Sequence, residues 1–264
     1  MGNRVLMGDS ALKSWGNALL GFVYPEACQI CHAQRATPAE GYVCAACWQD
    51  VRFIKPPFCD RCGLPYPGEI TTAFECGNCR DVKLYFRGAR SAVAAQGVVL
   101  DAIHHYKYQR ALWFEPFLAD LLLRAALPEL RAESWDLVVP IPLHRLKERD
   151  REFNQAERLG RHLAAALGIR QRIDLVERVL PTVTQTRLDR AERAGNVHRA
   201  FAPRRGARLQ GEKVILLDDV FTTGATTNAC ARVLRSLGAG EVFVWTLARG
   251  VAGPKLSFEL PAGS

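Results

Sequence analysis

The spacing of the cysteines in the first third of the chain is the strongest constraint on the fold. Eight of the nine cysteines lie within residues 28–79 as four Cys-x-x-Cys pairs, separated by 12, 11 and 13 residues. A Cys-x-x-Cys turn directs two thiolates at one tetrahedral ion, and two such turns about 12 to 20 residues apart complete a site with four thiolate ligands. The pairs are Cys28/Cys31, Cys44/Cys47, Cys59/Cys62 and Cys76/Cys79. Eight ligands predict two metal sites.

The pairs can combine sequentially along the chain or in an interleaved order. We expect sequential pairing, because closing a short loop costs less chain entropy, although interleaved zinc folds exist. The N-terminus lacks the order of a signal peptide, and the apolar run 18–24 is too short for a membrane span of about 20 residues. We therefore expect a cytoplasmic protein without membrane insertion. Disulfides are rare in that compartment, so structural zinc is favoured, with an iron–sulfur cluster as the alternative.

Length and loop-forming residues suggest two domains. At 264 residues the chain allows one large domain or two modest ones. The cysteine-rich segment holds several prolines and glycines, so we expect metal rather than a large apolar core to stabilise it. We predict an N-terminal helix with a double zinc ribbon in 1–87, and an α/β domain with a loose C-terminal tail in 88–264.

The positive charge is concentrated in the second half. The chain carries a formal charge of +8, and residues 144–208 alone hold 16 basic and 8 acidic residues, whereas 26–87 hold seven of each sign. A basic surface attracts phosphates on nucleic acids and on small metabolites alike. The aromatic residues of the neutral ribbon segment are expected to pack its small core rather than to stack on bases, because single-strand grooves are normally basic. They are Trp48, Phe53, Phe58, Tyr66 and Phe74.

From residue 88 onward, short apolar segments alternate with segments whose apolar residues have helical spacing. This alternation is typical of an α/β sheet. We expect Pro128 to end the second helix, and Gly168 and Gly238 to cap the last two. The expected strands are 89–95, 137–141, 213–217 and 241–247, and the expected helices are 98–106, 112–127, 155–167 and 226–237.

The chemistry is concentrated after the strand expected at 213–217, where two acids precede a hydroxyl-rich glycine turn that opens a helix. Ligands of open parallel sheets bind beyond the carboxyl ends of the strands, so Asp218 and Asp219 should reach the rim of a site. Two carboxylates suit the paired hydroxyls of a ribose. The following turn offers backbone N–H groups and hydroxyls for a phosphate. It comprises Thr222, Thr223, Gly224, Ala225 and Thr226.

This segment resembles the 5-phosphoribosyl 1-pyrophosphate motif of type I phosphoribosyltransferases. Further motifs resemble the ComF family, competence-associated proteins that join a cysteine-rich zinc module to a phosphoribosyltransferase-like part. They are Pro140-Ile-Pro-Leu-His144-Arg145, Lys107-Tyr108, Phe153-Asn154-Gln155-Ala156, Thr184-Gln185-Thr186, Glu192-Arg193 with Asn196-Val197, and Leu247-Ala248-Arg249. The resemblance implies a type I phosphoribosyltransferase fold, a parallel sheet flanked by helices with a hood.

The resemblance also implies a ligand and a role for each part of the site. Asp218 and Asp219 would be catalytic, binding ribose hydroxyls directly or through Mg²⁺, and the 222–226 turn would bind the 5-phosphate. Pro142, His144 and Arg145 would meet the pyrophosphate, and Lys107 and Tyr108 would line the acceptor side. A mobile loop, 185–196, would bring Arg187, Arg190 or Arg193 to the phosphates. For His144 a turn-capping role is the favoured alternative, and for the arginines a solvated helix face is an equal one.

Two functions follow as expectations. The first is a phosphoribosyltransferase, a glycosyltransferase that moves a pentosyl group, acting in competence and the use of external DNA. The second is a non-catalytic adaptor of the DNA uptake machinery that binds single-stranded DNA or competence proteins. One departure bears on the site: Glu152 stands where the family usually has glycine. Its carboxylate would either weaken binding of an anionic ligand or pair with Arg149 or Arg151 at the surface.

Overall fold

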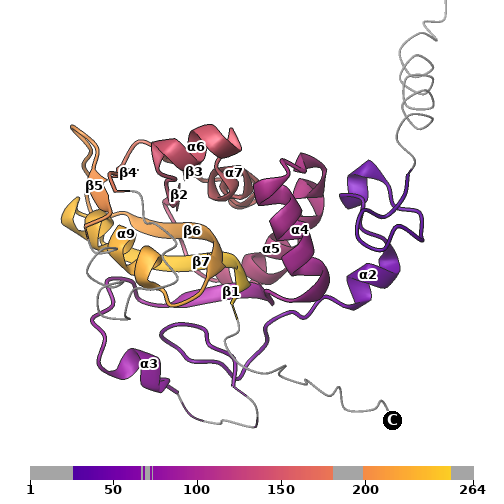
Figure 1. Ribbon diagram of the computed structural model, residues 1–264. Coiled ribbons are helices and arrows are strands. Elements are labelled where there is room, and N and C mark those ends of the chain that lie inside the picture. Colours follow the sequence, from indigo (N-terminus) through magenta and orange to yellow (C-terminus); the bar gives the residue numbers. More distant parts are fainter. Residues whose placement is uncertain (1–25, 67, 69–71, 73, 181–198, 251–264) are drawn as a thin grey trace, which may run out of the picture.

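A five-stranded, fully parallel sheet is the centre of the molecule. The computed structural model describes residues 26–66, 68, 72, 74–180 and 199–250 (Figure 1). The strands run in the order β1-β7-β6-β2-β3. Their bounds are β1 (Ala89–Ala94), β2 (Leu137–Pro140), β3 (Arg170–Gln171), β6 (Lys213–Phe221) and β7 (Glu241–Arg249), and a separate antiparallel pair consists of β4 (Val176–Arg178) and β5 (Phe201–Pro203).

Helices cover both faces of the sheet, which explains the unbroken apolar runs of the central strands. On β6, Ile215 and Leu217 face one helical layer, while Val214 and Leu216 face the other. The first layer consists of α4 (Gly97–Tyr108), α5 (Glu115–Leu130) and α7 (Gln155–Leu167), and the second is α9 (Ala225–Ser236) with the β4–β5 pair. Two short helices, η2 (Leu112–Phe114) and α6 (Arg145–Arg151), lie between the longer elements.

The helix boundaries follow local chemistry. Asn154 caps α7, since its side chain accepts hydrogen bonds from the N–H groups of Ala156 and Glu157. Gly168 ends α7 in the left-handed conformation, as predicted. Within the described part of the chain, no helix combines the length and hydrophobicity needed to cross a membrane.

Two sequence expectations about element ends were wrong. Pro128 does not end α5, which continues to Leu130. A proline this close to a helix end sacrifices a single hydrogen bond, and the buried Leu130 favours continuation. The strand expected to stop at Leu217 extends to Phe221, because β7 is equally long and pairs with it as far as Phe221 opposite Arg249.

The cysteine-rich segment forms two small units on different sides of the α/β layers (Figure 1). The first, 26–50, contains η1 (Pro38–Glu40) and α2 (Ala45–Gln49) and packs on α5, where the Trp48 and Phe117 rings meet edge-on at 5.0 Å. The second, 58–80, contains α3 (Gly77–Arg80) and packs beside β1 and α9. The expected packing role of the aromatic residues is confirmed for Trp48 and for Phe74, which contacts Tyr66 at 4.6 Å.

Candidate functional site

The topology of the sheet predicts a crevice between β2 and β6. These strands are neighbours, but the helices that follow them, α7 and α9, cover opposite faces of the sheet. Loops that leave adjacent strands in opposite directions open a crevice at the carboxyl edge, which is where open α/β sheets bind ligands. The 222–226 turn follows β6 and the turn containing Pro142 follows β2, so the topology brings two predicted parts of the site together.

The two acids lie inside the end of β6 rather than beyond it, which corrects the sequence expectation. Pairing with β2 stops at Pro140 opposite Leu217, so the next residues of β6 border the crevice. Successive strand residues point to opposite faces. Asp219 accordingly meets Lys107 of α4, with Nζ 2.7 Å from Oδ2, whereas Asp218 interacts with Arg178 on the other side.

The electrostatics of this acid pair leave negative charge incompletely compensated. Burial, followed by the charge of Asp219, raises the pKa of Asp218 to about 7. The hydrogen bond from the Asp219 N–H to Asp218 Oδ1, 2.9 Å, and the charges of Lys107 and Arg178 oppose this increase without cancelling it. A cation or a set of hydroxyl donors bound here would therefore be stabilised.

The 222–226 turn forms an anchored helix N-terminus. Gly224 has φ 78° and ψ 1°, a left-handed conformation that favours glycine, and a Cβ at this position would lie 2.6 Å from the Phe221 ring. Thr227 Oγ1 donates to the Gly224 carbonyl at 2.9 Å, and Thr223 Oγ1 accepts a 3.4 Å hydrogen bond from the Ala225 N–H. The turn and α9 thus present N–H groups and hydroxyls at the end of β6.

Of the remaining predicted site residues, the structure describes the side chains of His144 and Tyr108 but not those of the arginines. His144 caps α6 by accepting a 3.3 Å hydrogen bond from the Leu146 N–H, which confirms the turn-capping alternative. Tyr108 is 69% exposed, and its ring lies 5.1 Å from the Arg151 guanidinium. The side chain of Arg145 and the whole of 185–196, with Arg187, Arg190 and Arg193, lie outside the described residues.

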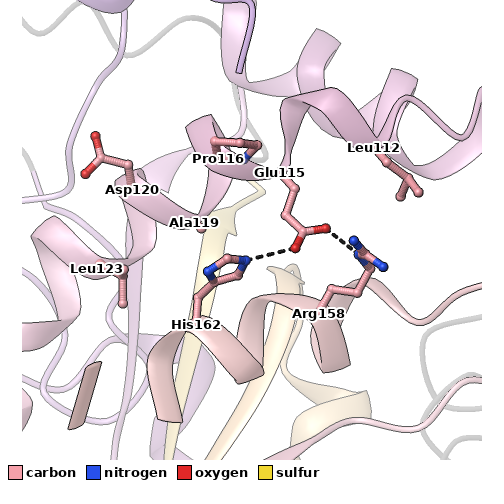
Figure 2. Close-up of a pocket in the computed structure, with 8 residues that line it drawn as sticks. All are labelled: Leu112, Glu115, Pro116, Ala119, Asp120, Leu123, Arg158 and His162. Carbon is pink, nitrogen blue, oxygen red and sulfur yellow. Dashed lines mark hydrogen bonds and ion pairs between the residues drawn. The ribbon is translucent and has the colours of Figure 1, made fainter. Parts of the chain in front are cut away.

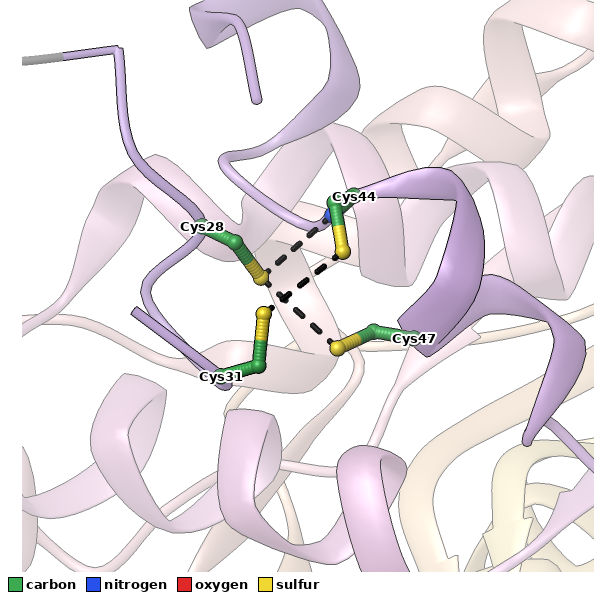
Figure 3. A group of neighbouring side chains, drawn as sticks. All are labelled: Cys28, Cys31, Cys44 and Cys47. Atoms are coloured by element: carbon green, nitrogen blue, oxygen red, sulfur yellow. Dashed lines mark hydrogen bonds between the residues drawn. The ribbon is translucent and has the colours of Figure 1, made fainter. Parts of the chain in front are cut away.

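The eight paired cysteines form two groups of four in sequential order, as predicted. Cys28, Cys31, Cys44 and Cys47 make the first group (Figure 3), and Cys59, Cys62, Cys76 and Cys79 make the second. Zinc–sulfur bonds of about 2.3 Å in a tetrahedron place the sulfur atoms about 3.8 Å apart. Sulfur–sulfur contacts measure 3.7 Å and 3.7 Å in the first group and 3.6, 3.6 and 4.0 Å in the second, so both groups fit zinc.

Thiol acidity within each group also favours a cation. Burial acts to raise the pKa of Cys28, but backbone N–H groups, led by that of Cys31, outweigh it and lower the pKa to about 6. Burial, and after it the thiol of Cys44, raises the pKa of Cys47. The second group repeats this contrast, with a lowered pKa at Cys59 and a raised pKa at Cys79. A divalent ion would allow all four thiols of a group to ionise.

Comparisons with known proteins agree with both parts of the molecule. The family model "Double zinc ribbon domain" matches residues 19–80. "Competence protein F" of Haemophilus influenzae is 31% identical over 221 residues, covering 80% of this chain and 92% of that protein. The chain belongs to the ComF family.

Other relatives of this ComF chain have similar coverage. "DNA utilization protein YhgH" of Salmonella typhimurium is 31% identical and covers 85% of this chain and 97% of its own length. "Competence protein ComFC" of Bacillus subtilis is 27% identical, over 78% and 84%. A purine phosphoribosyltransferase structure from Pyrococcus horikoshii matches 56% of this chain and 95% of its own length, at 15% identity and a TM-score of 0.34.

The glutamate at the position of the usual ComF glycine adopts the backbone conformation that glycine favours. Glu152 follows α6 with φ 64° and ψ −3°. Its carboxylate pairs with Arg110 at 2.9 Å, not with Arg149 or Arg151, and both partners are more than half exposed. The side chain is therefore a surface group, while the strain of a positive φ remains in the backbone.

Sequence reasoning missed a charged cluster between α5 and α7. Glu115, in the first turn of α5, accepts hydrogen bonds from Tyr106 at 2.9 Å, from His162 at 2.8 Å and from Arg158 (Figure 2). The cluster borders an open cavity of about 450 Å³. No local motif marks these residues, because 43 positions separate Glu115 from Arg158. Only the spacing of Arg158 and His162 on one helical face was visible in the sequence.

Proposed function

We propose that this chain binds 5-phosphoribosyl 1-pyrophosphate in the crevice between β2 and β6, and transfers its phosphoribosyl group to an acceptor in competence or DNA utilization. The observation that supports this most directly is the end of β6, where the acid pair leads into the anchored helix N-terminus of α9. The names of the relatives support the process, since they are competence and DNA utilization proteins. We also propose a cytoplasmic location, where thiols stay reduced.

Each part of the crevice receives a role in this proposal. The N–H groups of the 222–226 turn hold the 5-phosphate, and Asp218 and Asp219 hold the ribose hydroxyls. The turn after β2, with Pro142, His144 and Arg145, lies beside the pyrophosphate, and Lys107 faces the acceptor side. Carboxylates are also ligands that Mg²⁺ prefers, and a cation bound here would favour ionisation of Asp218, whose pKa is raised first by burial and then by the charge of Asp219.

The proposed reaction is displacement at the anomeric carbon. The bond from C1 to the pyrophosphate oxygen breaks, a new bond from C1 to the acceptor forms, and the acceptor loses a proton. Mg²⁺, when bound, would neutralise negative charge on the departing pyrophosphate. The carboxylates of β6 orient the ribose while positive charge develops on the ring, and a closed crevice excludes water as a competing acceptor.

Titration calorimetry with 5-phosphoribosyl 1-pyrophosphate, with and without Mg²⁺, tests the binding. We expect the double variant Asp218→Asn, Asp219→Asn to lose about tenfold or more in affinity, because charged hydrogen bonds to the ribose are removed. The double variant Asp101→Asn, Asp120→Asn changes two carboxylates of α4 and α5 and should bind normally. A wild-type protein that fails to bind at millimolar ligand overturns the proposal. Pyrophosphate release across a panel of acceptors then identifies the reaction.

The basic excess of residues 144–208 favours a second candidate, an adaptor that binds single-stranded DNA. The acid pair argues against the crevice as the DNA groove, since carboxylates repel phosphates. Binding of a single-stranded oligonucleotide at several salt concentrations separates the candidates. Strong, salt-dependent DNA binding without pyrophosphate release would favour the adaptor.

A further inference from the structure

Arg249, the last residue of β7, is a buried cation whose role the proposed site does not use. It is 4% exposed, and among the described residues it pairs with no carboxylate. Its guanidinium instead contacts Cys62 of the second cysteine group. Nη1 donates to the Cys62 carbonyl, and Nη2 lies 3.6 Å from Cys62 Sγ.

This contact has a clear electrostatic reason once the second cysteine group holds zinc. A divalent ion with four thiolates leaves the group with a net charge of about −2. A buried cation that donates to a ligand sulfur compensates part of that charge, and burial of the cation is tolerated only with such a partner. Arg249 therefore fits as a counter-ion of the second zinc group.

The same guanidinium contacts the residue that precedes the proposed phosphate-binding turn. It lies 4.5 Å from the centroid of the Phe221 ring, and the Phe221 ring in turn fills the space beside Gly224. The Gly250 N–H also donates to the Phe221 carbonyl at 2.8 Å. A continuous set of contacts thus runs from Cys62 through Arg249 and Phe221 to the turn.

A second connection reaches α9 from the segment that follows the second cysteine group. The side chain of Asn228, near the start of α9, accepts from the Tyr85 N–H at 2.8 Å and donates to the Lys83 carbonyl at 2.9 Å. Phe86 packs edge-on against Phe221 with the ring centroids 6.5 Å apart. The second ribbon, through Arg249, and the segment that follows the ribbon therefore contact both ends of the turn.

We propose that Arg249 is a positioning residue that couples the second zinc group to the phosphate-binding turn at 222–226. With zinc bound, Arg249 stays beside Cys62 and holds the Phe221 ring against Gly224, so the turn is ordered before a sugar phosphate arrives. The ligand part of this coupling rests on the proposed function. Because coupling of binding free energies is reciprocal, a sugar phosphate in the turn also raises the zinc affinity of the second group.

Amide hydrogen exchange of residues 222–226 tests the coupling without any ligand. Arg249→Lys and Phe221→Leu should each keep two zinc ions per chain, yet exchange in the turn about fivefold faster or more than wild type. Arg90→Lys is the matched control, since Arg90 donates to the Asp60 carbonyl of the same ribbon at 3.1 Å and does not contact the turn. Unchanged exchange in both variants overturns the proposal. So does equal acceleration in the control.

Ribose 5-phosphate affinity provides the second measurement. We expect Arg249→Lys and Phe221→Leu to bind it about fivefold more weakly or worse, and Arg90→Lys to bind it normally. In the wild type, ribose 5-phosphate should raise the affinity for one zinc ion, measured at equilibrium against a competing chelator, and Arg249→Lys should lose this increase. If the wild type binds neither ribose 5-phosphate nor 5-phosphoribosyl 1-pyrophosphate, the proposed function fails, while the exchange measurement still decides whether Arg249 orders the turn.

Discussion

At the residue scale, Asp218 should make the stability of the apo protein depend on pH. Its pKa rises from an ordinary 3.8 to about 7 on folding, so the native state binds more protons than the unfolded chain between these values. The stability that the neutral carboxyl contributes is therefore lost as pH rises through 7. The stability advantage of Asp218→Asn over wild type should therefore be larger at pH 8.5 than at pH 5 by about 1 to 3 kcal/mol. Denaturant unfolding at both values measures this.

The control for this prediction is Asp101→Asn, at an exposed position of α4. Its difference from wild type should be the same at pH 5 and pH 8.5. If the difference in unfolding free energy between Asp218→Asn and wild type is also the same at both pH values, the pKa of Asp218 is not raised by folding.

Glu152 provides a second residue-scale prediction, because its backbone and its charge can be separated. Glu152→Gly should raise the free energy of unfolding by about 0.5 to 1 kcal/mol, since glycine adopts φ 64° without strain. The lost surface pair with Arg110 is worth only about 0 to 1 kcal/mol. Glu152→Gln removes the charge and keeps the strain, so it should not gain this stability. Thermal unfolding of the three proteins measures the effect.

The same pair of variants tests whether the carboxylate weakens ligand binding. If it does, both Glu152→Gly and Glu152→Gln should bind 5-phosphoribosyl 1-pyrophosphate more tightly. A tighter glycine variant alone would assign the effect to the backbone, and equal affinity in all three would show that this departure from the ComF family leaves the site unaffected.

At the scale of helices, Glu115 joins α4, α5 and α7 through Tyr106, Arg158 and His162. Burial acts to raise its pKa, but the hydrogen bonds, led by that from Arg158, lower it overall. The stability it contributes is thus present at neutral pH and is lost as pH falls through the lowered pKa. We expect Glu115→Ala to cost about 1 to 3 kcal/mol, because it leaves the hydroxyl of the buried Tyr106 unpaired and removes the hydrogen bonds to the partly exposed Arg158 and His162.

Asp120→Ala is the matched control for the helix prediction. Asp120 borders the same cavity and pairs with Arg124 on one exposed helix face. Its removal should cost about 0.5 kcal/mol or less. Chemical denaturation at pH 7 compares the two variants, and equal costs would contradict a joining role for Glu115.

At the scale of the whole molecule, the ribbons and the α/β layers share their cores. Cys28, Cys44 and Cys47 belong to the same buried cluster as the α4 and α5 side chains, and the second cysteine group belongs to the cluster that contains α9. We propose a division between the two parts near residue 87, and the shared cores imply that the two parts unfold together.

Elemental analysis should find two zinc ions per chain, and chelation should destabilise the entire protein. Cys59→Ser should retain about one zinc ion and lower the melting temperature of the single unfolding transition, since structural zinc contributes folding energy directly. Two separate transitions, with the α/β part melting as in wild type, would show that the modules are independent. Freshly purified protein without zinc would contradict the metal assignment itself.

The sequence by itself determined the features that depend on neighbours along the chain. The Cys-x-x-Cys spacing predicted two groups of four cysteines, and the lower entropy cost of short loops favoured their sequential order. The periodicity predicted the main strands and helices, and the order of acids, threonines and Gly224 predicted a turn after a strand. These features follow from local backbone geometry, because a pattern of a few residues is enough to specify a metal turn, an apolar face or a helix cap.

Tertiary structure alone decided which distant residues meet. It extended β6 to Phe221 because β7 continues beside it, and it paired Lys107 with Asp219. It also placed Arg249 against Cys62, 187 positions away. No short-range pattern encodes such contacts, because they depend on the order of strands in the sheet and on which helices cover each face, and these are settled only when the whole core packs.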